Sequence, residues 1–134
     1  MAILFYDGKN ALLTASTIGT LQGNTNIKAM LIKSTYSAVS AAHGYADLSP
    51  HFATGLTAVT LTSCAVINSK TFDADDVTFP TVNTGQTING VLVYYENGGT
   101  RKLLSYSDTG TGFPFSTNGA NVVVSFSVTG VFTL

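Results

Sequence analysis

The chain has no tryptophan, a single cysteine, three prolines and few charges. Charged residues make up 10% of its 134 residues, against about 25% in an average globular protein. The lone Cys64 excludes an intramolecular disulfide and, inside an apolar run, is predicted to be a small core residue. Thr, Ser, Asn and Gly must therefore cover much of the surface, a composition that suits contact with other protein because little charge has to be desolvated.

The charges that are present form no patch. Six Lys and Arg residues are scattered between Lys9 and Lys102, and the net charge is −1. Nucleic-acid binding needs clustered cations to neutralise phosphates, so we expect no nucleic-acid partner. No apolar run approaches the ~20 residues of a membrane helix, and no cation precedes the apolar residues 3–6 as it would in a signal peptide. We expect no membrane partner, and we expect synthesis and assembly in the cytosol.

Strand signals dominate the chain after a short N-terminal region. Ile27–Lys33 has strand composition, and Thr57–Thr62 alternates Thr with apolar residues, the period of a half-buried strand. Ile88–Tyr95 is apolar on both faces in part, which predicts a central strand. Glu96–Thr100 is a hairpin turn signal. Asn10–Ser16 is the best helix candidate, with Asn10 as its N-cap.

These signals predict an all-β fold in one domain over residues 1–134. Several short strands with turns between them are typical of an antiparallel β-sandwich or a jelly-roll-like barrel, here with a short N-terminal helix. The segments Asn121–Phe126 and Gly130–Leu134 are predicted to close the chain as a hairpin.

Two groups of side chains have metal-ligand chemistry. Asp73, Asp75 and Asp76 are the one acidic cluster and could hold a hard cation, but adjacent strand residues point to opposite faces, and an ordinary polar loop is the simpler interpretation. His43, Asp47 and His51 are spaced four apart, a zinc-binding spacing on a continuous helix. Gly44 and Pro50 interrupt that helix, so we predict hydrogen-bonded or solvent-exposed histidines and no metal.

No catalytic constellation is evident. Asp108-Thr109-Gly110 matches the core of the aspartic-protease motif, but its neighbours have turn composition. No nucleophile elbow and no phosphate-binding glycine loop is found. The sequence therefore predicts no enzyme, no cofactor and no catalytic residue.

Two places are candidate docking surfaces. Ile3, Leu4, Phe5 and Tyr6 are four consecutive apolar residues, costly to leave in water at ~25 cal/mol per Å². They could dock on a partner, or they could form a strand of the domain's own sheet, and the sequence favours neither. Tyr94 and Tyr95 are adjacent, so one is expected inside and the other, Tyr95, outside as an interface anchor.

The order of several motifs resembles a widespread family of small tailed-bacteriophage virion proteins. The segments that carry the resemblance are Gly8–Leu13, Ile27–Tyr36, His43–Ser49, Asp73–Phe79, Val91–Tyr95, Leu103–Asp108 and Gly130–Leu134. They span nearly the whole chain and recur in the family's order. Phe79 stands where the family commonly has Trp, and Ala38–Thr57 is shorter than usual.

The resemblance implies a structural component of the virion. The first expectation is a head decoration or cement protein, bound to the major capsid protein outside the shell and bridging capsomers. The alternative is a tail, neck or fibre component bound to the corresponding proteins. A homo-oligomer is expected, and a trimer would fit a threefold capsid site. A carbohydrate-binding module is a further class, but the chain lacks the Trp of the usual stacking platform.

Overall fold

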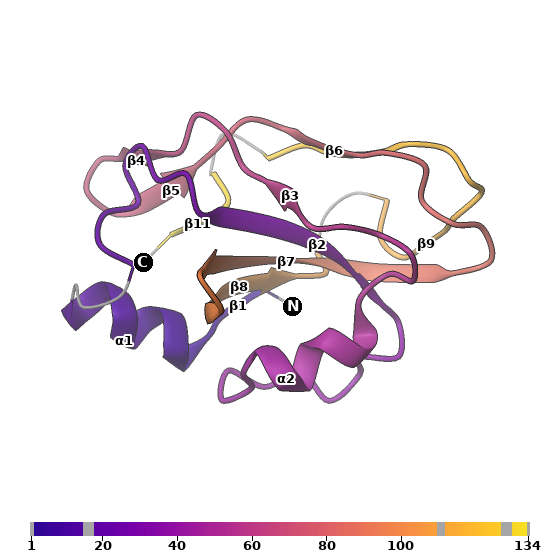
Figure 1. Ribbon diagram of the computed structural model, residues 1–134, viewed down its shortest axis with the longest axis horizontal. Coiled ribbons are helices and arrows are strands. Elements are labelled where there is room, and N and C mark those ends of the chain that lie inside the picture. The colour runs from indigo at the N-terminus through magenta and orange to yellow at the C-terminus, as the bar shows by residue number, and fades with distance from the viewer. Residues whose placement is uncertain (1, 15–17, 110–111, 127–129, 134) are drawn as a thin grey trace.

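The computed structural model describes residues 2–14, 18–109, 112–126 and 130–133. Its strands form a wide main sheet and an upper layer of two small sheets, while α2 (Tyr45–Leu48) lies on the opposite face of the main sheet and α1 (Tyr6–Thr14) lies at one end of the molecule (Figure 1). Every strand pair in the described ranges is antiparallel. The prediction of a mainly antiparallel β fold is confirmed, and the sheets do not close into a barrel.

The main sheet has six strands in the order β1-β8-β7-β2-β3, with β9 paired to the start of β7. These strands are β1 (Ala2–Leu4), β2 (Ile27–Lys33), β3 (Val59–Thr60), β7 (Thr87–Asn97), β8 (Thr100–Ser107) and β9 (Phe115–Ser116). β7 is the central strand of this order, as its apolar sequence predicts. Most of its residues are buried because both of its faces are covered.

The hairpin between β7 and β8 follows directly from its turn sequence. Asn97 pairs with Thr100, which leaves Gly98 and Gly99 as a two-residue turn. Their φ angles are 57° and 86°, the left-handed values that a type I′ turn demands and that glycine adopts without strain. The predicted turn is thus confirmed.

The upper layer consists of a three-stranded sheet, β11-β5-β4, and a two-stranded sheet, β10-β6. Its strands are β4 (Ala65–Ile67), β5 (Thr71–Asp73), β6 (Val77–Phe79), β10 (Val122–Val124) and β11 (Phe132–Thr133). The predicted terminal hairpin is wrong, since β10 pairs with β6 and β11 with β5. Gly130 (φ 77°) turns the chain against β5, where the Val131 amide donates to the Phe72 carbonyl at 2.7 Å.

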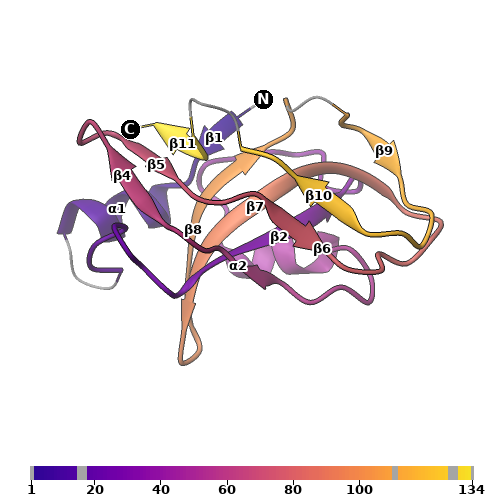
Figure 2. The ribbon, with the colours of Figure 1, turned by 90° about the horizontal axis from the view of Figure 1, so that it is seen from above.

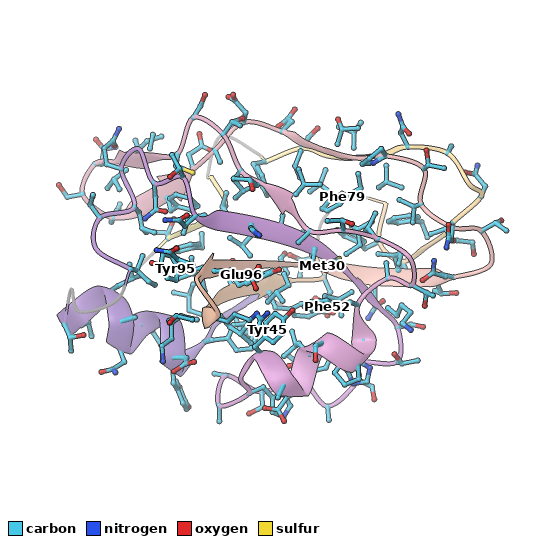
Figure 3. The ribbon with its side chains drawn as sticks, viewed as in Figure 1. Met30, Tyr45, Phe52, Phe79, Tyr95 and Glu96 are labelled. Atoms are coloured by element: carbon cyan, nitrogen blue, oxygen red, sulfur yellow. The ribbon has the colours of Figure 1, made fainter. Side chains whose placement is uncertain are left out.

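Each face of the main sheet carries its own apolar core. Toward the upper layer, residues such as Leu31 and Val93 pack with Phe72 and Phe79. Toward α2, Met30, Ile32, Leu92, Tyr94 and Tyr106 pack with Leu48. Figure 3 shows Phe79 on the upper side and Tyr45 and Phe52 on the α2 side. The alternation of side chains along each strand supplies both cores.

The helical elements are α1 (Tyr6–Thr14), α2 (Tyr45–Leu48) and the 3₁₀ turn η1 (Ser49–His51). Ala11 of α1 packs in the upper core, whereas Leu48 of α2 packs in the lower one. α1 starts earlier than the predicted Asn10, because Gly8 lets the helix approach β8 so closely that a Cβ there would lie 2.9 Å from the Leu104 Cα atom. Ala15 and Ser16, the end of the predicted helix, lie outside the described residues. No helix in the described ranges is long and apolar enough to cross a membrane.

Candidate functional site

A half-open cleft of about 1050 Å³ lies between the main sheet and the upper layer. Its floor consists of Val91 and Val93 from β7 and Ser105 and Ser107 from β8. Val91, Val93 and Ser105 are almost fully buried, so the floor is held in place by the packed sheet. The cleft is therefore a feature of the rigid core region and not of a surface loop alone.

Aromatic and branched side chains form the walls of the cleft. One wall comes from the segment around β9, where the half-buried rings of Phe113 and Phe115 lie with centroids 5.8 Å apart. The other wall comes from β10 and the residues after it, with half-buried Val122, Val124 and Phe126. Figure 2 shows β9 and β10 on the same side of the molecule, joined by a loop, with β7 running beneath β10.

The chemistry of the lining is neutral. The described residues that line the cleft are Val, Phe, Ala and Gly together with Ser, Thr and Asn, and none of them is charged. Asp76 lies nearby, but its Oδ1 accepts a hydrogen bond from the Phe126 amide at 3.1 Å and so anchors the end of this wall. Such a lining offers apolar contact and hydrogen bonds, and its described part contains no group that would transfer a proton near neutral pH.

Strand β10 borders the cleft with an edge that the described chain leaves open. β10 pairs with β6 on one side, and no described strand pairs with its other side. In a strand, backbone N–H and C=O groups point alternately to the two sides, so part of the β10 backbone lacks a strand partner. Val123 at its centre is 60% exposed, and neither charge nor proline protects this edge.

The predicted docking segment at the N-terminus is mostly part of the sheet. Ile3 and Leu4 are half-buried in β1, opposite Tyr106 and Ser105 of β8. Phe5 is fully buried, whereas Tyr6 is 61% exposed. The alternative of a strand in the domain's own sheet thus holds for this segment, and Tyr6 is its exposed residue.

The expectation that Tyr95 faces outward is wrong. Tyr95 is 6% exposed and Tyr94 2% exposed, in the upper and lower cores respectively. Adjacent residues do point to opposite faces, as expected, but β7 is covered on both. Tyr95 therefore cannot anchor a partner on the surface.

The three clustered aspartates each have a separate structural partner. Asp73 accepts from the Ala74 amide at 2.9 Å, and Asp75 from the hydroxyls of Thr62 at 3.3 Å and Ser63 at 2.7 Å. Asp76 holds Phe126, as described above. Over the described ranges, no three His, Cys, Asp or Glu side chains are placed to share a metal ion. The carboxylates fix the loops between strands of the upper layer.

The two histidines meet around a buried tyrosine that sequence reasoning did not single out. The ring of Tyr36 lies 5.7 Å from that of His43 and 5.5 Å from that of His51. The Tyr36 hydroxyl bonds to His43 Nδ1 at 2.9 Å, and the Thr35 hydroxyl to His51 Nδ1 at 2.7 Å. Burial raises the pKa of Tyr36, which keeps the phenol neutral. Both histidines are therefore hydrogen-bonded, as predicted.

Asp47 does not join the two histidines. Its Oδ2 accepts the Gly44 amide at 2.8 Å, which caps the first turn of α2. Gly44 precedes this helix and Pro50 lies in η1, so the continuous helix required for a zinc-binding face does not form. The sequence Asp108-Thr109-Gly110, which matches the core of the aspartic-protease motif, borders the cleft. Thr109 lines the cleft, and Gly110 lies outside the described residues.

A second polar cluster was not foreseen from the sequence. Glu96, near the end of β7, pairs with Lys28 at 3.0 Å and with Arg101. The Arg101 guanidinium lies 4.4 Å from the centre of the Tyr45 ring. Hydrogen bonding from Lys28 is the main cause that lowers the pKa of Glu96. The cluster links β2, the β7–β8 hairpin and α2. Its members are distant in sequence, so no local sequence pattern indicates it.

Cys64 is a core residue, as predicted. It is 5% exposed and belongs to the upper core. Burial raises the pKa of its thiol, which disfavours the reactive thiolate. We therefore assign it no chemical role.

Comparisons with protein-family models, with curated proteins and with solved structures find no match for this chain.

Proposed function

We propose that this chain is a structural protein of a tailed-phage particle, bound outside the head shell as a decoration protein. The observation that carries the proposal is the neutral cleft with the open β10 edge beside it, because its described residues offer apolar surface and backbone hydrogen bonds and include no titratable group. Such a site suits protein contact. The order of motifs along the chain, which resembles phage virion proteins, supports the choice of particle.

The action of such a protein is adhesive. Each copy buries complementary surface on neighbouring capsomers, and repetition around the shell multiplies a modest contact energy. Because the cleft lining is uncharged in its described part, its attachment depends on apolar burial, which salt does not screen. We therefore expect the protein to stay on particles washed at high ionic strength.

The same surface would also serve a tail, neck or fibre component, which is the alternative. In both proposals the partners are other virion proteins. Both also allow a homo-oligomer, such as a trimer at a threefold site. The position of this protein on the particle distinguishes the two proposals.

Particles that lack the chain provide a direct test. Purified protein is mixed with them and sedimented, and the bound fraction is compared for wild type, Val123→Lys and Leu13→Lys. Val123 borders the cleft, whereas Leu13, 86% exposed on α1, serves as a matched control for replacing an exposed apolar residue by Lys. We expect Val123→Lys to weaken binding about tenfold and Leu13→Lys to leave it unchanged.

Two results would count against this account. Failure of the wild-type protein to sediment with the particles would contradict a virion role. Equal binding of wild type and Val123→Lys would show that the β10 edge is not part of the attachment site.

A further inference from the structure

We infer that the cleft accepts one extended, uncharged peptide segment of a partner protein, which pairs with the open edge of β10 as an added strand. The inference rests on the part of the proposed function that has the chain bind protein. It does not depend on where on a particle the chain resides.

Backbone hydrogen bonding selects the class of occupant. β10 uses one side for β6, with Val122, Val123 and Val124 opposite Phe79, Thr78 and Val77. The groups on the other side repeat along the strand direction with the spacing that another strand's backbone satisfies. A lipid chain or a compact apolar ligand has no matching series of donors and acceptors. The edge therefore favours a peptide.

The charge of the lining selects the side chains of that peptide. Val122, Val124, Phe113 and Phe115 face the cleft region half-buried, and no charged residue is among the described lining. A Lys or Glu entering it would lose water without gaining an opposite charge, which costs several kcal/mol. Since strand side chains alternate, every second residue of the segment should be small and apolar, and the others can be polar.

The shape of the site indicates a single segment and not a second copy of this chain. The β9 side and the β10 side form the two walls, and β7 and β8 form the floor. A second copy that offered its own β10 would have to bring its main sheet and upper layer up to this edge as well. A single extended segment needs room for one strand only.

The test uses a synthetic peptide of alternating valine and threonine, blocked at both ends, and isotope-labelled full-length protein. Binding is followed by the NMR shifts and the hydrogen exchange of the backbone amides. We expect shifts centred on residues 122–126 and 113–116 and at least a tenfold slower exchange of those β10 amides that do not bond to β6. Val123→Lys should weaken binding about tenfold, and Leu13→Lys, the matched control, should not.

Two control peptides separate strand pairing from unspecific adhesion. One is methylated at its backbone nitrogens, so it cannot donate hydrogen bonds, and the other has lysine in place of valine. Both should fail to bind. Equal binding of the methylated peptide would overturn the inference in favour of a purely apolar ligand, and no shift with the unmodified peptide would overturn it as well. Presence or absence of the chain on particles decides the proposed function independently.

Discussion

Tyr36 and Tyr106 meet edge to face in the lower core, with ring centroids 5.3 Å apart and planes at 86°. Their hydroxyls have different surroundings. That of Tyr36 bonds to His43, whereas the buried hydroxyl of Tyr106 has no partner in hydrogen-bond geometry within the described part of the chain. Burial, and then Tyr36, raises the pKa of Tyr106, and the nearby Asn89 side chain acts in the opposite direction without forming a well-placed bond.

This contrast predicts opposite effects of the same substitution. Tyr106→Phe removes a buried group without a partner, so the free energy of unfolding should stay unchanged or rise by up to about 1 kcal/mol. Tyr36→Phe removes a hydrogen-bonded hydroxyl and leaves His43 unpaired, at a cost of about 1 kcal/mol. Urea unfolding of both variants measures the difference. A larger loss for Tyr106→Phe than for Tyr36→Phe would show that the Tyr106 hydroxyl is satisfied.

A glycine in β7 tests how closely the sheet is packed. At Gly90 a Cβ would lie 2.6 Å from the Ser107 carbonyl oxygen and 2.7 Å from Tyr106 Cε1. Gly90→Ala should therefore destabilise the protein by about 2 kcal/mol or more. Gly44→Ala is the control, because the nearest atom, Asp47 Oδ2, would lie 4.0 Å away. Thermal unfolding should separate the two variants, and similar melting temperatures would contradict the packing of β7 on β8.

The Glu96 cluster predicts a pH dependence of stability. The folded-state pKa of Glu96 is lowered, so its stabilising effect is complete above the unfolded pKa of about 4.3 and disappears as the pH falls through the folded value. Glu96→Gln should lower stability at pH 7 by about 1 kcal/mol or less, and the gap to wild type should close in strong acid. Urea titrations across this range check it. A gap independent of pH would rule out the ion pairs as its cause.

Two neighbours at the N-terminus separate folding from docking. Phe5 is fully buried and Tyr6 is 61% exposed. Phe5→Ala should cost about 3 kcal/mol or more, and Tyr6→Ala should change stability little. Melting temperatures test this pair. If Tyr6→Ala nevertheless lost particle binding, the N-terminal docking hypothesis would hold for this one residue.

Local signals made part of the fold predictable. The run Ile27–Lys33 and the Gly98-Gly99 turn are local in origin, and both formed as expected. The pairing of β10 with β6 and of β11 with β5 depends on which apolar surfaces meet after folding, and no local pattern encodes it. The last two strands are close in sequence, which favours a hairpin between them, but tertiary packing pairs each of them with a different strand.

The candidate site was less accessible to sequence reasoning. The cleft takes its walls from β9 and β10 and its floor from β7 and β8, and side chains so far apart in sequence carry no common motif. The apolar sequence of 88–95 predicts a central strand but does not show how far along the strand both faces are covered, so Tyr95, near the end of β7, is predicted on the surface although it is buried. A short strand of three valines, Val122–Val124, was the available signal for the open edge.

The decisive measurement is cryo-electron microscopy of phage particles purified from a host in which this chain is produced. We expect density for the chain on the outside of the capsid at symmetry-related positions, with the β10 edge and its cleft facing the shell. Density confined to the neck, tail or fibres would support the alternative location. Absence of the chain from the particle would contradict the proposed function.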